Sequence, residues 1–258
     1  MLPTLFKIGN ISIHTYGVLI AIGFIVSLKI SQIFAVKEGI NKELIYDFAV
    51  FVLIFAIIGA RIFYIFEYHS FYFKHPFEIF KIWKGGLVFY GGLIFGIIAV
   101  IINVKRYKLN LWKIGDIFLV ALPLGQFFGR LGCLSAGCCY GKPCNLPWAI
   151  KFTNEEALAP KNIYLHPTEI YHALANLTIF FILFFYYKKG NKKFDGEIAL
   201  LYGMLYSIGR FIIEFYRGDY RGHIWIFSIP QIISIIIFWI SLIIYFIKRR
   251  KSNEKTFS

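Results

Sequence analysis

The composition of this 258-residue chain excludes an ordinary soluble domain. Hydrophobic residues make up 58% of it, aromatic residues 20% and charged residues only 16%, which is typical of a polytopic membrane protein. The formal net charge of +14 would suit a nucleic-acid ligand. Lys and Arg fall mainly in short clusters between apolar segments, however, which is typical of membrane topology signals. We therefore expect no nucleic-acid partner.

Seven apolar segments follow one another along the chain. Because an isolated strand cannot satisfy its backbone groups in lipid, we predict that all seven are helices. No cleavable signal pattern precedes the first segment, so we expect that segment itself to direct insertion. The predicted spans cover about residues 13–34, 48–67, 87–104, 115–130, 168–187, 197–216 and 224–247.

Positive charge divides the connecting segments into two sets. One set contains fifteen Lys and Arg, against nine in the segments on the other side. By the positive-inside rule, this predicts an N-terminus outside the membrane and a C-terminus in the cytoplasm. We expect one transmembrane domain over residues 1–247, followed by a basic cytoplasmic tail at 248–258. The segments at about 68–86 and 131–167 then face outward, so any chemistry should open to that side.

Arg130 directly follows the fourth apolar segment and lies between Gly129 and Gly132, with Gly137 and Gly141 beyond. A cation next to lipid is costly unless an anion meets it. The glycines would let a ligand approach the backbone while the guanidinium contacts two phosphate oxygens. The alternative is an arginine that extends from a helix end to the membrane surface. Arg61 and Arg210 also lie in or at the ends of apolar segments, which favours a buried phosphate site.

A second polar group lies in the sixth apolar segment. Tyr206, Arg210, Glu214 and Arg217 recur at intervals that place them on one face of a helix. A structural ion pair between Arg210 and Glu214 is the alternative to a ligand site, but it would not require Tyr206 on the same face.

The entry to the fifth apolar segment reads His166-Pro167-Thr168-Glu169. Thr168 or a neighbour is expected to cap the helix, with Glu169 in its first turn, where the helix dipole favours an acid. His166 remains a candidate base, because an imidazole titrates near neutral pH.

Four cysteines lie within twelve residues, at positions 133, 138, 139 and 144. Their C-x4-C-C-x4-C spacing is not the pattern of a zinc site, so we expect no metal there. On an oxidising outer face they could form one or two disulfides, with three full connectivities open. They could equally be packed small residues.

In combination, these motifs resemble the prolipoprotein diacylglyceryl transferase family, from the first span to the last and in matching order. The resemblance rests on His14-Thr15-Tyr16-Gly17, Gly59-Ala60-Arg61, Tyr90-Gly91-Gly92-Leu93, Gly129-Arg130-Leu131-Gly132, His166-Pro167-Thr168-Glu169-Ile170-Tyr171, Gly209-Arg210-Phe211-Ile212-Ile213-Glu214-Phe215-Tyr216-Arg217, Ser228 and Gln231.

The resemblance implies an enzyme of the bacterial inner membrane, without cofactor, that moves the diacylglyceryl group of phosphatidylglycerol onto the lipobox cysteine of prolipoproteins and releases glycerol phosphate. Arg130 would bind the lipid phosphate, and Arg210 would act at the headgroup or leaving group. The implied catalytic residues are Arg130, Arg210, Tyr90 and Tyr206. The implied substrate-binding residues are Arg130, Tyr16, Arg61, Gly91, Gly92, Glu214, Arg217 and His166.

Three positions depart from the commonest family pattern. Tyr90 replaces a His, Cys133 an Asn and Cys138 a Glu. A tyrosine, with a reference pKa of about 10, is a poorer base than histidine at neutral pH, so the identity of the base is open.

Two other classes of function would also suit the residues. A lipid or small-anion transporter would place arginines between helices, although such proteins more often have duplicated halves with broken helices. An outward-facing thiol-redox protein of the membrane would use Cys133 or the Cys138-Cys139 pair.

Overall fold

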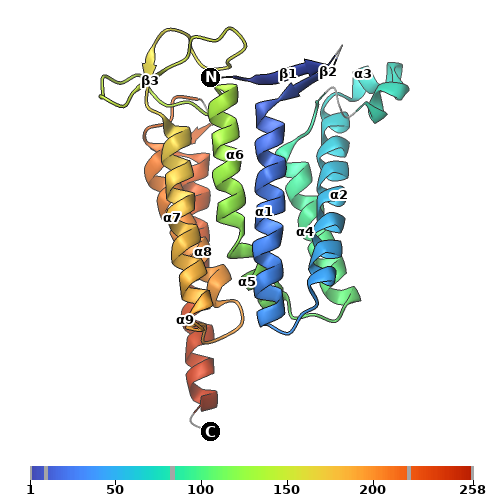
Figure 1. Cartoon of the computed structure of the whole chain (residues 1–258), viewed down its shortest axis with the longest axis vertical. Coiled ribbons are helices and arrows are strands. Elements are labelled where there is room, and N and C mark those ends of the chain that lie inside the picture. Colours follow the sequence, from blue (N-terminus) through green and yellow to red (C-terminus); the bar gives the residue numbers. More distant parts are fainter. Residues whose placement is uncertain (1, 9–10, 82–84, 220–221, 257–258) are drawn as a thin grey trace. The chain divides into compact units, whose positions relative to one another are not determined.

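The computed structural model describes residues 2–8, 11–81, 85–219 and 222–256. Helices predominate, and three two-stranded antiparallel hairpins connect or precede them (Figure 1). The helices are α1 (Thr15–Lys37), α2 (Lys42–Glu67), α3 (His69–Lys74), the 3-10 helix η1 (Pro76–Phe80), α4 (Phe89–Arg106), α5 (Leu111–Leu119), α6 (Leu122–Ala136), α7 (Thr168–Lys188), α8 (Glu197–Glu214) and α9 (Ile229–Thr256). The hairpins are β1–β2 (Thr4–Ile8, Ile11–His14), β3–β4 (Ile150–Lys151, Tyr164–Leu165) and β5–β6 (His223–Ile224, Phe227–Ser228).

Every predicted span contains a helix, and the helical membrane fold is confirmed. By length and composition, α1, α2, α4, α7 and α9 can each cross a membrane, and α5 with α6 forms a sixth candidate. Helix α8 has three charged residues among its 18, Glu197, Arg210 and Glu214, more than such a span usually contains. A seventh span at α8 stays a prediction.

The fourth predicted span differs most from the structure. It was expected as one helix over 115–130, but α5 and α6 are bent by 43° at a short break. Pro123 lies in the first turn of α6, where its missing N–H costs nothing and its fixed φ suits a helix start. Helix α6 then continues to Ala136 and ends at Gly137, whose φ of 68° is the left-handed helix cap. Arg130 is therefore inside a helix rather than at its end.

The chain forms two compact units. Unit 1 comprises residues 1–31 and 115–258, and unit 2 comprises residues 32–114. The expectation of a single transmembrane domain stays a prediction.

In unit 2, α2 and α4 pack together through glycines. A Cβ on Gly91 would lie 2.4 Å from the carbonyl oxygen of Gly59, and one on Gly92 would lie 3.2 Å from that of Ala56. Small residues at such crossings let helix backbones approach closely in membranes. These contacts give Gly91 and Gly92 a packing role, and their expected role in substrate binding stays a prediction.

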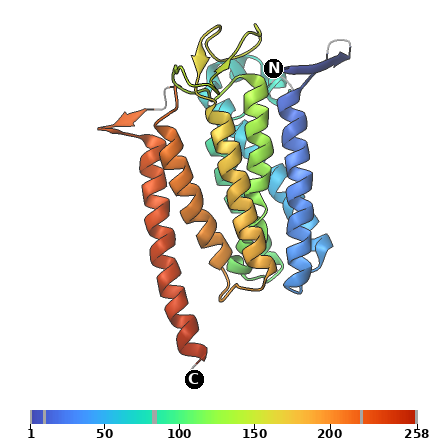
Figure 2. The same cartoon turned by 60° about the vertical axis from the view of Figure 1, so that its left-hand side comes forward.

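In unit 1, α6 packs on α7, α7 on α8 and α8 on α9 (Figures 1 and 2). The first half of α1 joins α6 where a Cβ on Gly23 would lie 2.9 Å from Phe128 and 3.1 Å from the Gly125 carbonyl oxygen. The start of α1 and the end of α9 lie at opposite ends of these helices (Figure 2). The loop that follows α6 lies at the same end as the N-terminus.

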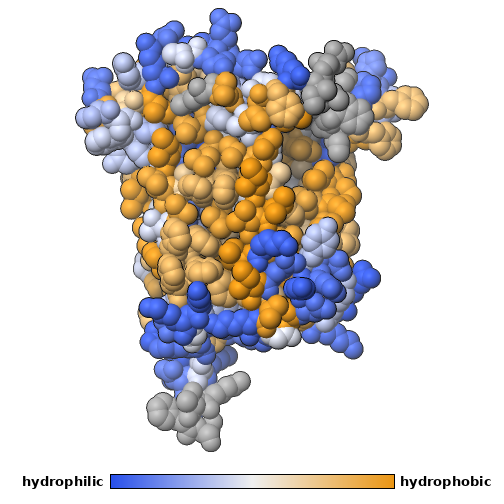
Figure 3. Space-filling view, viewed as in Figure 1, coloured by the Kyte–Doolittle hydropathy of each residue, from blue (hydrophilic) through white to orange (hydrophobic). Residues whose placement is uncertain are grey.

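The outer faces of the unit 1 helices suit lipid. Ile182 and Phe185 on α7, and Ile240 and Ile243 on α9, are about half exposed. Hydrophobic side chains cover the middle of these helices and hydrophilic ones gather around their ends (Figure 3). An apolar band with polar ends is expected of helices that cross a bilayer.

A buried carboxylate sets where α8 begins. Asp116, on α5, accepts hydrogen bonds from the amides of Gly196 (2.8 Å) and Ala199 (2.9 Å) and forms an ion pair with Lys192 at 3.4 Å. It thus satisfies orphan N–H groups of the first turn of α8, whose own N-cap, Gly196, has no side chain. The position of α8 along its axis, and with it that of Arg210 and Glu214, depends on this cap.

We predict that Gly91→Ala destabilises the protein, because the new methyl would overlap the Gly59 carbonyl and Phe63. Overpacking of this kind typically costs about 1–3 kcal/mol. The thermal midpoint in detergent should fall accordingly. Gly96→Ala is the matched control on the same helix, since its nearest neighbour would be 3.9 Å away. Equal midpoints for the two variants would contradict the close crossing.

Candidate active site

The site is organised by the segment that follows α6, residues 137–145, which we call the cysteine loop. Backbone hydrogen bonds tie it on one side to the entry of α7, from the Gly141 amide to the His166 carbonyl (3.2 Å) and from the His166 amide to the Lys142 carbonyl (3.0 Å). On the other side, the Lys142 amide donates to the Tyr216 carbonyl (2.8 Å). The loop thereby joins three segments that are far apart in sequence.

Two glycines permit this docking. A Cβ on Gly141 would lie 2.4 Å from the carbonyl oxygen of His166, and a Cβ on Gly218 would lie 2.5 Å from the carbonyl oxygen of Gly141. Only residues without a side chain allow backbones to approach this closely.

Arg210 is a buried cation with partners on two helices. Its side chain is 8% exposed, and its Nη1 lies 2.6 Å from Glu214 Oε2 and 3.1 Å from His172 Nε2. Arginine is only a donor, so His172 Nε2 accepts and the imidazole proton is on Nδ1. Glu214 in turn accepts from the Ser228 hydroxyl (3.1 Å), and the Ser228 backbone amide donates to Gln231 Oε1 (2.9 Å). The Arg210–Glu214 pair predicted from spacing is thus present.

Two further guanidiniums act on the same group. Arg130, on α6, and Arg217, just after α8, both interact electrostatically with His172 and with Arg210. Arg217 is held by Asp219 through a bidentate contact of 2.8 and 2.7 Å. In the described part of the chain, no hydrogen bond or ion pair engages the guanidinium of Arg130. Arg130 can therefore bind an external anion without first breaking a hydrogen bond or ion pair to another described residue.

Helix α7 presents a buried polar face that the sequence analysis missed. Glu169, His172 and Asn176 are each at most 3% exposed. Their spacing of three and four residues on an apolar helix was the available signal, since it places them on one face. Neither carboxylate oxygen of Glu169 has a hydrogen-bond partner on another described residue.

The expected cap at the start of α7 is only partly as predicted. Glu169 does lie in the first turn, but Pro167 is the N-cap residue and provides no side-chain hydrogen bond. The Thr168 hydroxyl instead donates to the carbonyl oxygen of Cys139 at 2.8 Å. Thr168 therefore fixes the cysteine loop rather than its own helix.

His166 belongs to an aromatic group beside the loop. Its Nδ1 lies 3.2 Å from the Tyr171 hydroxyl, which also accepts from Trp148 Nε1 at 2.8 Å. The His166 ring centroid is 5.1 Å from that of Tyr216. His166 is half-buried at the rim of the loop, whereas His172 is the histidine in contact with Arg210.

Tyr16 and Tyr206 are also in unit 1. The Tyr16 ring lies against Gly132, where an added Cβ would be 3.0 Å from Cδ2, and its phenol interacts electrostatically with Arg130 and with three cysteines. Tyr206 stacks on Tyr202 with centroids 5.5 Å apart and interacts with the charge of Arg210.

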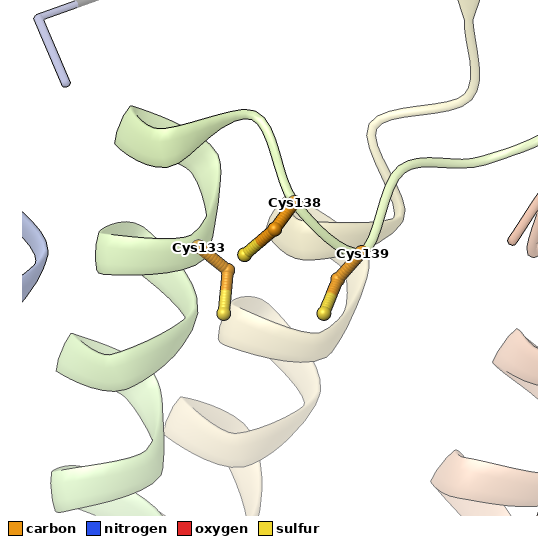
Figure 4. Close-up of side chains that lie close together, drawn as sticks. All are labelled: Cys133, Cys138 and Cys139. Atoms are coloured by element: carbon orange, nitrogen blue, oxygen red, sulfur yellow. The ribbon is translucent and has the colours of Figure 1, made fainter. Parts of the chain in front are cut away.

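None of the four cysteines, all of which the structure describes, forms a disulfide. The thiols of Cys133, Cys138 and Cys139 lie within 4.8 Å of one another and point toward a common space (Figure 4). Hydrogen bonds with the thiols of Cys133 and Cys138, and with Arg217, hold the pKa of Cys139 well below its ordinary value. Burial alone would lower the pKa of Arg217, but its contacts with Asp219 and Cys139 raise it.

The remaining predicted site residues are in unit 2. The guanidinium of Arg61 donates to the backbone carbonyls of Glu78 (2.7 Å), Ile79 (3.0 Å), Gly85 (2.7 Å) and Gly86 (3.1 Å). These four bonds anchor the segment before α4, and the expected role of Arg61 in substrate binding stays a prediction. Tyr90, at the start of α4, is 60% exposed and contacts Phe89.

Comparison with known proteins agrees with the motifs. The family model described as prolipoprotein diacylglyceryl transferase matches residues 3–247. The chain belongs to this family. Relatives named phosphatidylglycerol--prolipoprotein diacylglyceryl transferase include those of Clostridium tetani, 36% identical over 96% of this chain and 98% of the relative, and Finegoldia magna, 36% identical over 97% and 98%. The protein of that name from Synechocystis is 38% identical over 84% of this chain and 79% of the relative. The resemblance inferred from the sequence is confirmed.

We predict that Gly141→Ala loosens the cysteine loop, because the methyl cannot fit beside the His166 carbonyl. Steric insertion in a packed site costs about 1–3 kcal/mol. Hydrogen exchange of the amides of Gly141, Lys142 and His166 should then accelerate by about tenfold or more. Gly115→Ala, whose new Cβ would lie 3.6 Å from Ala199, should leave these amides unchanged. Unaltered exchange in Gly141→Ala would contradict the docking.

Proposed function

We propose that this chain transfers the diacylglyceryl group of phosphatidylglycerol to the thiol of the lipobox cysteine of prolipoproteins, with release of glycerol phosphate. Membership of the family supports this activity. The structural observation that supports it best is the group of three interacting guanidiniums in unit 1, of which Arg130 has no described protein partner. Cations placed among apolar helices are expected to meet an anion, and the phosphate of an anionic lipid is such an anion.

Arg130 is proposed to bind the lipid phosphate. Its planar guanidinium can contact two phosphate oxygens at once, which a lysine cannot do. Arg210 is proposed to stabilise the charge that develops on the departing phosphate ester. Among the described residues, only its Nη1 is engaged, so Nε and Nη2 can donate to an anion. Donors positioned in advance, in a site with little water, are the most effective stabilisers of developing charge.

Glu214, His172 and Tyr206 are proposed to position Arg210. Glu214 and His172 contact it directly, and Glu214 is itself held by Ser228. Tyr16, Arg217 and His166 line the same end of unit 1 and are proposed to contact the substrate. No metal or nucleotide is needed for the roles of these residues.

The acceptor thiol must lose its proton, because the thiolate is the nucleophile and a free cysteine is only a few per cent ionised at pH 7. Tyr90 occupies the position at which the family usually has a histidine base. We propose that it positions the lipid, since the arginines favour the thiolate without a strong base.

We propose that the protein is in the bacterial cytoplasmic (inner) membrane, with its N-terminus outside and its active site open to the outer side. The division of Lys and Arg between the connecting segments supports this orientation. In unit 1, the cysteine loop lies at the end of the helices opposite the basic C-terminal segment (Figure 1).

Arg130→Ala and Arg210→Ala are expected to lower transfer by about 10²–10³-fold or more, the usual cost of removing one such donor. Arg130→Lys should also impair transfer, because it lacks the planar fork. The measurement is transfer of labelled diacylglyceryl from phosphatidylglycerol to a lipobox peptide. Arg250→Ala is the control, since the Arg250 side chain is 84% exposed and pairs only with Glu254 among described residues. Near wild-type turnover in Arg130→Ala would remove Arg130 from the site.

The orientation predicts which engineered thiols are accessible in intact cells. A membrane-impermeant thiol reagent should label cysteines introduced at 70–80 and 150–160, above the background of the native chain, and should not label those at 188–196. Permeabilised cells should label all three sets. The opposite pattern would reverse the orientation.

A further inference from the structure

The thiols of Cys133, Cys138 and Cys139 form the one group of three potential metal ligands found among the described residues. Cys133 comes from α6, and the other two come from the loop just beyond it (Figure 4). The left-handed turn at Gly137 reverses the chain after α6, so that thiols five and six residues further on return beside Cys133. The spacing of the cysteines along the sequence argued against a metal site, because it does not reveal that the chain reverses its direction at Gly137.

We propose that these three thiols bind a zinc ion, and that the fourth position of the ion takes the lipobox thiol of the substrate. The second half of this proposal rests on the proposed function. Zinc in catalytic sites has three protein ligands and one open position, and its bonds to sulfur are about 2.3 Å long. Sulfurs around such an ion are about 3.8 Å apart by tetrahedral geometry, which small side-chain adjustments can reach from a group within 4.8 Å.

The chemistry of the ligands selects the metal. Thiolates are soft ligands that suit zinc, whereas magnesium and calcium prefer oxygen. A disulfide would use only two of the three thiols and leave the third beside it. All three cysteines are only partly buried, so an external ligand can reach the space that they share.

The surroundings hold the loop in the conformation that such a site needs. Cys139 has a φ of 70°, a conformation that costs a non-glycine residue about 1–3 kcal/mol and that clusters at functional sites. Its carbonyl is fixed by the Thr168 hydroxyl at 2.8 Å. Its thiol interacts electrostatically with Arg217, which is in turn held by Asp219. Outer contacts of this kind orient metal ligands and tune their charge.

The charges also balance. A zinc ion with three thiolates has a net charge of −1, and a fourth thiolate makes it −2. Arg130 and Arg217 both interact electrostatically with these cysteines and offset that charge. The same Arg130 is proposed to bind the lipid phosphate, which would place the reacting carbon of the lipid near the fourth ligand.

A histidine base would help to deprotonate the acceptor thiol, and Tyr90 is a poorer base. The zinc site would promote that deprotonation instead. When the lipobox thiol binds the metal, its S–H proton passes to water and the sulfur remains as a thiolate. That sulfur attacks the glyceryl carbon attached to the phosphate oxygen. A C–S bond forms, the C–O bond breaks, and its electron pair leaves with glycerol phosphate, whose added negative charge balances the released proton. No oxidant or reductant is consumed.

The first experiment measures metal in the purified full-length protein. We expect about one zinc per chain, and a fall of at least tenfold in Cys133→Ser, Cys138→Ser and Cys139→Ser. Cys144→Ser is the matched control, because Cys144 is outside the group and should keep its zinc. Thermal unfolding of each variant checks that it is folded. A zinc-free native protein, even after addition of zinc, or copper as the bound metal, would overturn the proposal.

The second experiment tests the open position without relying on turnover or on variants. The native protein is loaded with cobalt(II), whose visible spectrum reports its ligands, and is titrated with a lipobox peptide. A peptide with its cysteine should change the spectrum, and the same peptide with serine should not. Equal spectra with both peptides would overturn the role of the metal in binding the acceptor.

Activity separates this inference from the proposed function. Zinc-loaded protein that transfers no labelled diacylglyceryl would overturn the proposed function and leave the zinc site intact. Undiminished transfer by the Cys133→Ser, Cys138→Ser and Cys139→Ser triple variant, shown to contain no zinc, would overturn the inference and leave the function intact.

Discussion

A guanidinium buried in an apolar helix needs a counter-charge, and much of unit 1 is arranged around that need for Arg210. A buried charge that lacks a partner is costly by several kcal/mol, so Glu214 one turn away is a structural necessity before it is anything else. Glu214 is itself buried and is held by Ser228 at the start of α9. His172, from α7, accepts from the same nitrogen of Arg210. Three helices are thus joined through one cation.

The need of a buried cation for a counter-charge also distinguishes the three arginines of the site, because only some of them have a described partner within the protein. Arg210 and Arg217 have internal partners, which hold their side chains in defined positions. Arg130 has none among the described residues, and it is the one that an external phosphate would complete. In such a site the paired arginines keep the surrounding structure in place when no ligand is bound. The arginine without a described partner is then positioned in advance to bind an anion.

The cysteine loop lies next to this charged group in unit 1. Its backbone is fixed by Gly141 and Gly218 against the segments before α7 and after α8, so the cysteines and Arg217 share one rigid frame. Where the family usually has an asparagine and a glutamate, this chain has Cys133 and Cys138, and it has Tyr90 in place of a histidine. The proposed zinc site would relate these substitutions, since a metal that ionises the acceptor thiol reduces the demand for a strong base.

By itself, the sequence determined the helical membrane fold, the order of the apolar segments along the chain, and the family. Those properties depend on hydropathy, charge distribution and local motifs, which are read along the chain. The Arg210–Glu214 pair was also predictable, because a spacing of four residues on one helix is enough to bring side chains together.

Only the tertiary structure decided which residues from different helices meet. Glu169 looked like a dipole-favoured acid of a helix start, and its burial beside the cysteine loop depends on how α7 packs. Nothing in the local sequence around Arg61 indicates that its guanidinium donates to four backbone carbonyls from residues 78–79 and 85–86. The three thiols converge because a left-handed residue and two close backbone approaches fold the loop back on α6. Such contacts join residues distant in sequence, and no local period or spacing encodes them.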